Sequence, residues 1–218
     1  MKSFRFAKLL PIFLLFVFSC RGKESALISA NQLDAHKTQL QEGDIIFQTS
    51  LSSQSKAIQL ATHSKWSHMG IVFKQNENWY VFEASNVVKA TKLNDWIERG
   101  EGGHYVIKRV IDDSKIKSAD NLAAMKKCAN KFLGKKYDLY FEWSDDKIYC
   151  SELVWKVYDA GLHIQVGQLQ HLKDFDLSNA AVQQKMKERF GTKIPYNETV
   201  ISPQAMFESD LLKQIDEH

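Results

Sequence analysis

The chain has 218 residues, enough for one large domain or for a domain with an attached tail. Its 44% apolar and 25% charged residues are ordinary for a globular protein and exclude a chain that is disordered throughout. Lys2, Arg5 and Lys8, in the first 19 residues, account for the formal charge of +3. The remainder is therefore neutral and carries no polybasic surface for nucleic acid.

The first 19 residues have the composition of an export signal. Basic residues precede an apolar run from Leu9 to Phe18, which is too short to cross a bilayer, since a spanning helix needs about 20 apolar residues. The run ends at Ser19 and Cys20, and this ending resembles a bacterial lipobox, in which the cysteine becomes the lipidated N-terminus. We therefore expect an exported, membrane-anchored lipoprotein of the cell envelope; an ordinary cleaved signal peptide is the alternative.

This interpretation divides the chain into a signal peptide over 1–19, a polar tether over 20–35 and one folded domain over 36–218. The cysteines agree with the division. If Cys20 is lipidated, Cys128 and Cys150 remain. They form either one disulfide or two free thiols, and the sequence leaves both possibilities open.

The sequence of the folded part predicts strands in the middle, with helices before and after them. Strands are predicted after Gly43-Asp44 at 45–47, and at 66–73, 79–84, 87–93 and 104–110. Helices are predicted at 52–62, 93–99, 118–133, 150–160 (ended by Gly161) and 180–190, with a short one started by Ser202-Pro203. This order predicts an α+β fold with a mostly antiparallel sheet.

A polar segment joins two of these strands into a hairpin, and the length of its loop decides what faces His68. Strand alternation puts His68 and Gly70 on the same face. With a two-residue loop at Gln75 and Asn76, His68 pairs directly with Glu83, and Gly70 leaves space beside the pair. A loop of odd length would turn the carboxylate to the opposite face. A histidine–carboxylate pair of this kind fixes the imidazole tautomer and stabilises the imidazolium.

Cys150 begins a predicted helix, and its spacing from the apolar residues 153, 154 and 157 puts it on the buried face in the first turn. A helix N-terminus stabilises a thiolate, which favours a nucleophile, although a small core residue is the alternative. The candidate site is therefore Cys150 as nucleophile, His68 as base and Glu83 as the group that orients it. The residues alone do not show that Cys150 reaches the hairpin.

Other chemistry-bearing residues have simpler interpretations. Cys128 lies on the apolar stripe of its helix and is predicted to fill the core. Glu152 is predicted to be a solvent-facing or structural carboxylate. A zinc site built from Cys150, His68 and Glu83 lacks the paired spacing of known zinc ligands, so we expect no metal and no cofactor.

Several stretches occur in a characteristic order. They are GDIIF at 43–47, WSHMGIV at 66–72, VFEA at 81–84, GKKYD at 134–138 and YCSELV at 149–154, with Ser202-Pro203 near the end. Their order resembles that of the circularly permuted papain-like enzymes of the NlpC/P60 superfamily, in particular the YiiX/YaeF-like group.

The resemblance implies a permuted papain-like fold, in which the sheet with His68 and Glu83 precedes the helix of Cys150. It implies a thiol amidase or peptidase that passes through a thioester. The backbone N–H of Cys150 is then a donor to the oxyanion, while the second donor is not identified. Tyr137 and Tyr149 would line the substrate pocket, with ordinary packing as the alternative for each.

The expected substrate is an amide in a cell-wall peptide or another N-acyl compound. One alternative is a lipid acyl substrate, as in the related lecithin:retinol acyltransferase-like proteins. A long apolar groove beside Cys150 would favour the lipid, and a small polar pocket would favour the amide. The other alternative is a non-catalytic binding module of the cell envelope. The sequence leaves the oligomeric state and the role of residues 162–200 open.

Overall fold

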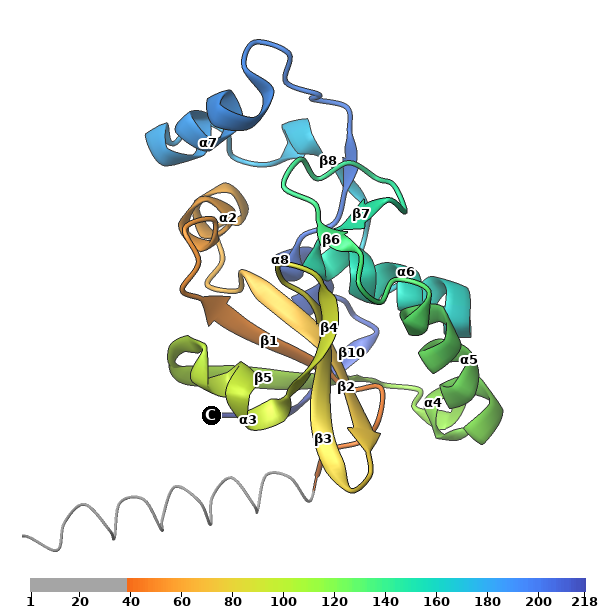
Figure 1. Cartoon of the computed structure of the whole chain (residues 1–218). Helices are drawn as coiled ribbons and strands as arrows, with labels where there is room; N and C mark the ends of the chain where they lie inside the picture. The colour runs from red at the N-terminus through yellow and green to blue at the C-terminus, as the bar shows by residue number, and fades with distance from the viewer. Residues whose placement is uncertain (1–38) are drawn as a thin grey trace, which may run out of the picture. The chain divides into compact units, whose positions relative to one another are not determined.

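A six-stranded antiparallel sheet carries the fold of residues 39–218, the part of the chain that this computed structural model describes. The predicted leader, Cys20 and the tether lie outside the described residues. The strands occur in the order β10-β5-β1-β2-β3-β4, and each pairs antiparallel with its neighbours (Figure 1). Their bounds are β1 Ile45–Ser50, β2 His68–Gln75, β3 Asn78–Ala84, β4 Val88–Lys92, β5 Gly100–Val110 and β10 Leu212–Glu217. Two further pairs of short strands form separate small sheets. They are β6 (Lys136–Tyr137) with β7 (Lys147–Ile148), and β8 (Gln170–His171) with β9 (Thr199–Val200).

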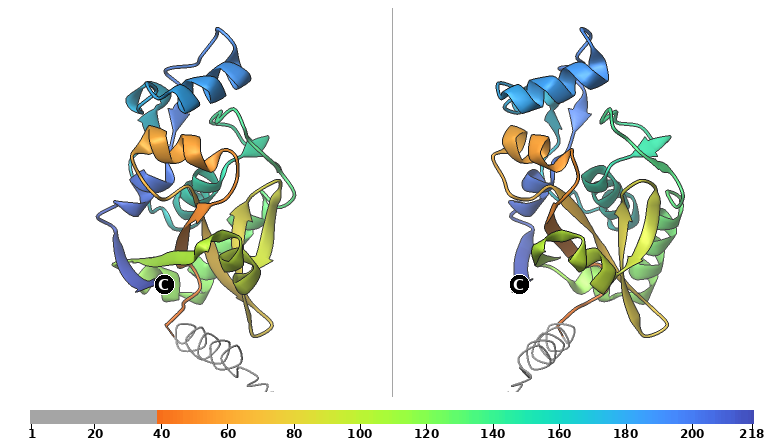
Figure 2. Two further views of the ribbon diagram at one scale, coloured as in Figure 1. Left: turned by 90° about the vertical axis from the view of Figure 1, so that its left-hand side faces the viewer. Right: turned by 60° about the vertical axis from the view of Figure 1, so that its left-hand side comes forward.

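The helices surround this sheet, which confirms the predicted α+β class. They are α2 Ser55–Thr62, α3 Leu93–Glu98, α4 Ser114–Lys117, α5 Ala119–Asn130, α6 Cys150–Leu162, α7 Ala180–Phe190 and α8 Pro203–Phe207, with a 3-10 turn, η1, at Leu172–Asp174. In Figures 1 and 2, α2 and α7 lie next to each other beyond one end of the sheet. A membrane-crossing helix is not found among residues 39–218, since each helix there is too short or too polar.

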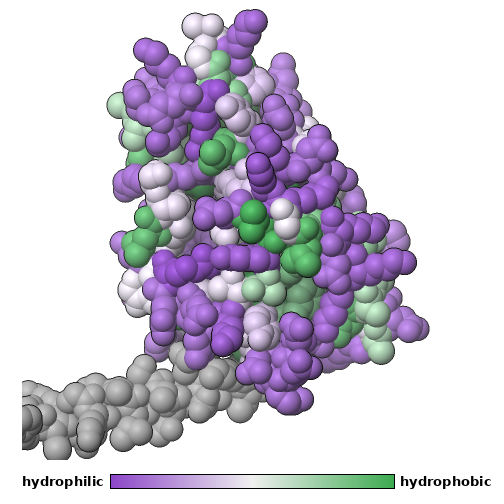
Figure 3. Space-filling model, viewed as in Figure 1, coloured by the Kyte–Doolittle hydropathy of each residue, from purple (hydrophilic) through white to green (hydrophobic). Residues whose placement is uncertain are grey.

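Both faces of the sheet are buried, because apolar residues occupy successive positions of its central strands. Ile45 and Ile71 point to the face covered by α6, and Ile46 and Val72 point to the face covered by Trp96 of α3. Each such side chain contributes about 1.5–3 kcal/mol by leaving water. Polar residues cover most of the molecular face in Figure 3.

The β2–β3 hairpin has the predicted even loop but a different register. Its turn consists of Asn76 and Glu77, both at positive φ, two residues that match a type I′ hairpin turn. Ile71 pairs with Phe82, so continuing the ladder puts Gly70 opposite Glu83. The direct pairing predicted for His68 and Glu83 is therefore wrong by two positions. The parity is unchanged, and the two side chains still share a face.

Helix α6 continues past the glycine that was predicted to end it. Gly161 lies inside the helix, which stops at His163 in the left-handed conformation. The glycine is needed for packing, because a Cβ on Gly161 would lie 2.8 Å from the backbone Cα of Met125 in α5. The start of α8 agrees with its prediction: Ser202 Oγ accepts from the N–H of Ala205, 3.0 Å away.

The segment 162–200, unassigned from sequence apart from the helix at 180–190, forms β8, η1, α7 and β9. It packs against α2 through a small apolar cluster that includes Leu172, Val182 and Met186. Strand β10 at the C-terminus was not predicted. It pairs with β5 and closes that side of the sheet.

Candidate active site

His68 and Glu83 meet on the face of the sheet that α3 covers. His68 Nε2 lies 2.6 Å from Glu83 Oε2, and both residues are buried. The contact runs diagonally across the hairpin, over Gly70. A Cβ at Gly70 would lie 2.4 Å from Val81 Cγ1 and 2.7 Å from the carbonyl oxygen of Phe82, so glycine allows the two strands to approach here.

Three further side chains hold the Glu83 carboxylate. Oε1 accepts from Thr91 Oγ1 (2.6 Å) and from Arg99 Nη2 (2.5 Å), and Oε2 also accepts from Trp96 Nε1 (3.1 Å). Burial opposes ionisation, but His68, then Thr91 and Arg99, lower the pKa of Glu83 to about 2. The carboxylate is therefore ionised at neutral pH.

These three partners of Glu83 were not identified from the sequence. Thr91 lies on β4, and Trp96 and Arg99 lie on and just after α3, so they approach the carboxylate from the neighbouring strand and the covering helix. The Trp96 ring also stacks on His68, with centroids 5.8 Å apart. An aromatic residue and an arginine around a short helix have no distinctive spacing, so no sequence signal pointed to them.

Cys150 is the first residue of α6, and the fold brings its thiol next to His68, close enough for the two groups to influence each other's charge. The three residues selected from the sequence are therefore together. Glu83 occupies Nε2 of the imidazole, so Nδ1 is the ring nitrogen that remains for the thiol. Burial disfavours the charged ring, but hydrogen bonds and charge interactions with Cys150 and Glu83 prevail and raise the pKa of His68 to about 9. Within residues 39–218, Cys128 and Cys150 are both buried free thiols.

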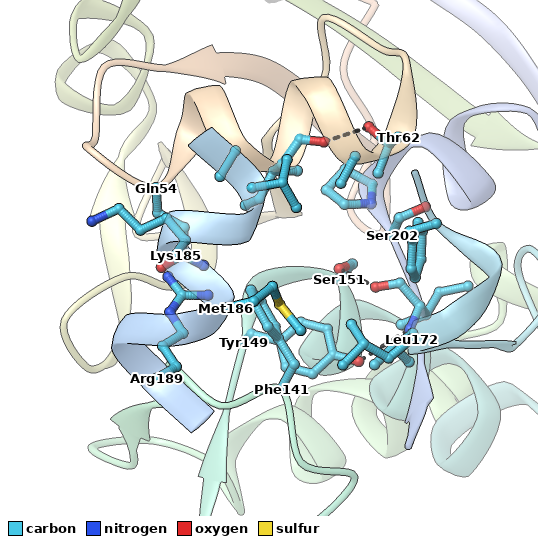
Figure 4. Close-up of a pocket in the computed structure, with 18 of the residues that line it drawn as sticks. Gln54, Thr62, Phe141, Tyr149, Ser151, Leu172, Lys185, Met186, Arg189 and Ser202 are labelled. Atoms are coloured by element: carbon cyan, nitrogen blue, oxygen red, sulfur yellow. Dashed lines mark hydrogen bonds between the residues drawn. The ribbon is translucent and has the colours of Figure 1, made fainter. Parts of the chain in front are cut away.

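A narrow cleft of about 90 Å³ lies between α2 and α7 (Figure 4). Cys150 is one of the residues that line it. The walls of the cleft are mainly apolar. They include Ala57, Ile58 and Ala61 of α2, Val182 and Met186 of α7, and Leu172, Phe175, Leu177, Val200 and Ile201. Of the two outcomes considered from the sequence, an apolar groove and a small polar pocket, the cleft is closer to the first.

The two tyrosines near Cys150 have different environments. Tyr137 lines the cleft beside the Cys150 thiol, and its hydroxyl accepts from Gln54 Nε2 at 3.4 Å. Burial, followed by the neighbouring Cys150, raises the pKa of Tyr137 well above its ordinary value, so the hydroxyl keeps its proton. Tyr149 is deeper, and its hydroxyl accepts from the N–H of Ile201 at 3.1 Å. Gln54 was not identified from sequence.

Glu152 is fully buried beneath the start of α6, which excludes the solvent-facing alternative and leaves the structural one. Its Oε2 accepts from the N–H of Tyr149 (3.4 Å), and its Oε1 lies 2.9 Å from Lys156 Nζ. Burial raises the pKa of Glu152 to about 7, with Lys156 and the N–H of Tyr149 opposing the shift. Glu152 therefore caps the helix that presents Cys150.

Known proteins resemble this chain over nearly all of the described region. A protein of Escherichia coli K12, described as uncharacterized protein YiiX, is 52% identical over 177 residues, which are 81% of this chain and 86% of the relative. The crystal structure of YiiX from Escherichia coli O157:H7, described as a metalloprotein, has a TM-score of 0.79 and 52% identity and covers 83% of this chain and 98% of its own. The family model of Peptidase C92, the permuted papain-like amidase enzymes YaeF/YiiX, matches residues 39–216. The chain therefore belongs to the permuted papain-like amidase family C92.

Proposed function

We propose that this chain is an exported, membrane-anchored thiol hydrolase that cleaves an amide bond in a cell-wall peptide or another N-acyl compound. One observation carries the proposal: a single buried imidazole contacts both an ionised carboxylate and the thiol at the N-terminus of α6. In this arrangement Cys150 is the nucleophile, His68 the base and then the acid, and Glu83 the group that orients His68.

In this reaction His68 carries the proton between the Cys150 thiol, the leaving amine and the attacking water. His68 takes the thiol proton and becomes an imidazolium as the Cys150 sulfur attacks the carbonyl carbon to form a tetrahedral oxyanion. Collapse breaks the C–N bond, the leaving amine takes the proton from His68, and a thioester remains. Water then gives a proton to neutral His68 as it attacks the thioester, and the thiolate is regenerated as the acid leaves.

We assign two groups to the stabilisation of the oxyanion. The N–H of Cys150, in the first turn of α6, is free of intrahelical bonding by its position. The Tyr137 hydroxyl accepts from Gln54 and therefore directs its own proton elsewhere, toward Cys150 or an oxyanion beside it. Tyr137 is our choice for the second donor.

The apolar cleft favours a second candidate reaction, hydrolysis or transfer of a lipid acyl group. A peptide presents a polar backbone at every residue, whereas the walls contributed by α2 and α7 offer mostly aliphatic contacts. A fatty acyl chain would bury its methylenes there at about 0.8 kcal/mol each. Both reactions share the same thioester on Cys150.

The residues that the structure describes do not fit a metal, although the relative from Escherichia coli O157:H7 is described as a metalloprotein. Within residues 39–218, no group of three or more histidine, cysteine, aspartate or glutamate side chains is arranged to hold an ion. Both oxygens of Glu83 already accept hydrogen bonds.

The proposal is tested by labelling with a thiol-directed activity probe, followed by screening of peptidoglycan fragments and acyl lipids. Wild type and Cys128→Ala should label and turn over substrate, whereas Cys150→Ala should do neither. His68→Gln should lower turnover by about 10²-fold or more, because general acid–base catalysis contributes about that much. Labelling of Cys128 with Cys150 unreactive would refute the hydrolase.

A further inference from the structure

Arg189 of α7 carries a positive charge into the candidate active-site cleft. It lines the same cleft as Cys150 and Tyr137, and Figure 4 shows it on α7 together with Met186. The side chain is half-buried, with its guanidinium carbon 5.2 Å from the centroid of the Phe141 ring. This cation–π contact holds the guanidinium against an aromatic wall of the cleft.

Arg189 has no ion-pair partner among residues 39–218, because its acidic neighbours are bound by other groups. Glu188 accepts from Gln184 (2.9 Å) and pairs with Lys185 (2.8 Å). Asp138 accepts from the N–H groups of Tyr140 and Glu142. Lys185, the other cation of the cleft, is thus neutralised and Arg189 is not.

An unpaired and partly dehydrated guanidinium destabilises the fold unless a ligand supplies hydrogen bonds and opposite charge. Burial lowers the pKa of Arg189 from its ordinary value, although the neighbouring Tyr137, Glu188 and Asp138 oppose the shift. A guanidinium nevertheless stays protonated and presents a planar set of donors that matches two oxygens of a carboxylate or phosphate.

We propose that Arg189 binds an anionic oxygen group, a carboxylate or a phosphate, on the substrate of the cleft. The inference rests on the proposed function for the identity of the cleft and deepens it, because it names the substrate class as acyl compounds with a negative charge. The apolar part would lie along α2 and α7, and the anion would lie over Phe141.

The test is binding to Cys150→Ala protein, measured by calorimetry with three probes of equal chain length. They are N-octanoylglycine (carboxylate), octyl phosphate (phosphate) and N-octanoylglycinamide (neutral). We expect at least one anion to bind about tenfold more tightly than the neutral amide, as for a charge-assisted hydrogen bond. The anion that binds more tightly shows whether the subsite recognises a carboxylate or a phosphate.

Matched variants of α7 assign the effect to one side chain. Adding Arg189→Met should remove the tenfold preference and leave the affinity for the amide unchanged, and Arg189→Lys should retain part of the preference. Lys187→Ala, at an exposed position of the same helix, should change nothing. The anion subsite would be overturned by equal affinity for both anions and the amide, by loss of anion and amide binding alike in Arg189→Met, or by no binding of any probe.

Turnover of the two N-octanoyl amides by the wild-type chain separates the two proposals. If the anions are preferred but neither the amides nor any other screened substrate is cleaved, the hydrolase fails and the subsite stands. If amides are cleaved with no dependence on charge in wild type or Arg189→Met, the subsite fails and the hydrolase stands.

Discussion

Glu83 is held by more than its partner in the candidate triad. Its two oxygens accept from His68, Thr91, Trp96 and Arg99. This set fixes the carboxylate, and through it the tilt of the imidazole. Because the folded pKa is near 2 and the ordinary value is 4.5, ionised Glu83 stabilises the fold above pH 4.5, and this contribution is lost as the pH falls toward 2.

We predict that Glu83→Ala lowers the free energy of unfolding by about 3–5 kcal/mol, since removing one partner of a buried ion pair leaves the other uncompensated. Urea denaturation at pH 7 measures the change. The exposed Glu98→Ala should stay within about 0.5 kcal/mol of wild type. A similar small change for both variants would contradict the role of the network.

The pKa of Glu152, at the start of α6, is shifted in the opposite direction to the pKa of Glu83. Its pKa is about 7 in the folded chain and 4.5 ordinarily, so the folded state binds its proton more tightly than the unfolded state. Stability from this group is therefore full below pH 4.5 and declines as the pH rises through 7.

We predict that Glu152→Gln removes this decline while Lys156 keeps its contact with Asp145 (2.7 Å). Relative to the variant, wild type should lose up to about 3 kcal/mol between pH 4.5 and pH 8. Urea midpoints across this range provide the measurement, with Glu98→Gln as the exposed control. Parallel curves for wild type and Glu152→Gln would show that the buried carboxylate does not titrate as proposed.

At the scale of elements, glycine sets how closely two pairs of elements approach. Gly70 lets β2 and β3 meet where His68 reaches Glu83, and Gly161 lets α6 lie against the backbone of α5. Both positions support the site: the first joins base and carboxylate, and the second seats the helix that begins with Cys150.

We predict that Gly161→Ala destabilises the fold by about 1–3 kcal/mol through overpacking, although alanine favours an isolated helix by about 1 kcal/mol. The reason is the 2.8 Å approach of the new Cβ to Met125 Cα. Thermal unfolding measures the change. Ala160→Gly, exposed on the same helix, should cost about 1 kcal/mol from propensity alone. A Gly161→Ala variant more stable than wild type would refute the packing argument.

At the scale of the whole described unit, the end of the chain completes the sheet. Strand β10 pairs with β5, and His218 and Tyr105 exchange two backbone hydrogen bonds of 3.0 Å each. Without β10, the 11-residue strand β5 would become an exposed edge, and exposed edges promote aggregation.

We predict that truncation after Ser209 lowers the melting temperature by about 10 °C. Losing the buried Leu212 and the β10 ladder costs about 3–5 kcal/mol of stability. In a unit of this size, 1 kcal/mol corresponds to about 2–4 °C. Scanning calorimetry and light scattering measure stability and aggregation. Gln214→Ala, at an exposed position of the same strand, should melt within about 2 °C of wild type. An unchanged melting temperature after truncation would show that β10 is dispensable.

Local rules were enough for a large part of this structure. Alternation and turn length put His68 and Glu83 on one face even though the predicted register was wrong by two, because a shift of two preserves the face. Helical spacing placed Cys150 in the first turn of its helix, and Ser202-Pro203 marked the start of another. These features depend on neighbours within a few residues, which a sequence displays directly.

By itself, the sequence therefore determined the fold class, the family resemblance and the three candidate residues. Only the tertiary structure decided that Cys150 reaches His68, that Thr91 and Arg99 hold Glu83, and that α2 and α7 enclose an apolar cleft with Arg189 in it. These contacts join residues from separate elements, and their geometry follows from packing around a shared core. Nothing in the spacing along the chain encodes that packing, which is why Arg189 and β10 were found only in the fold.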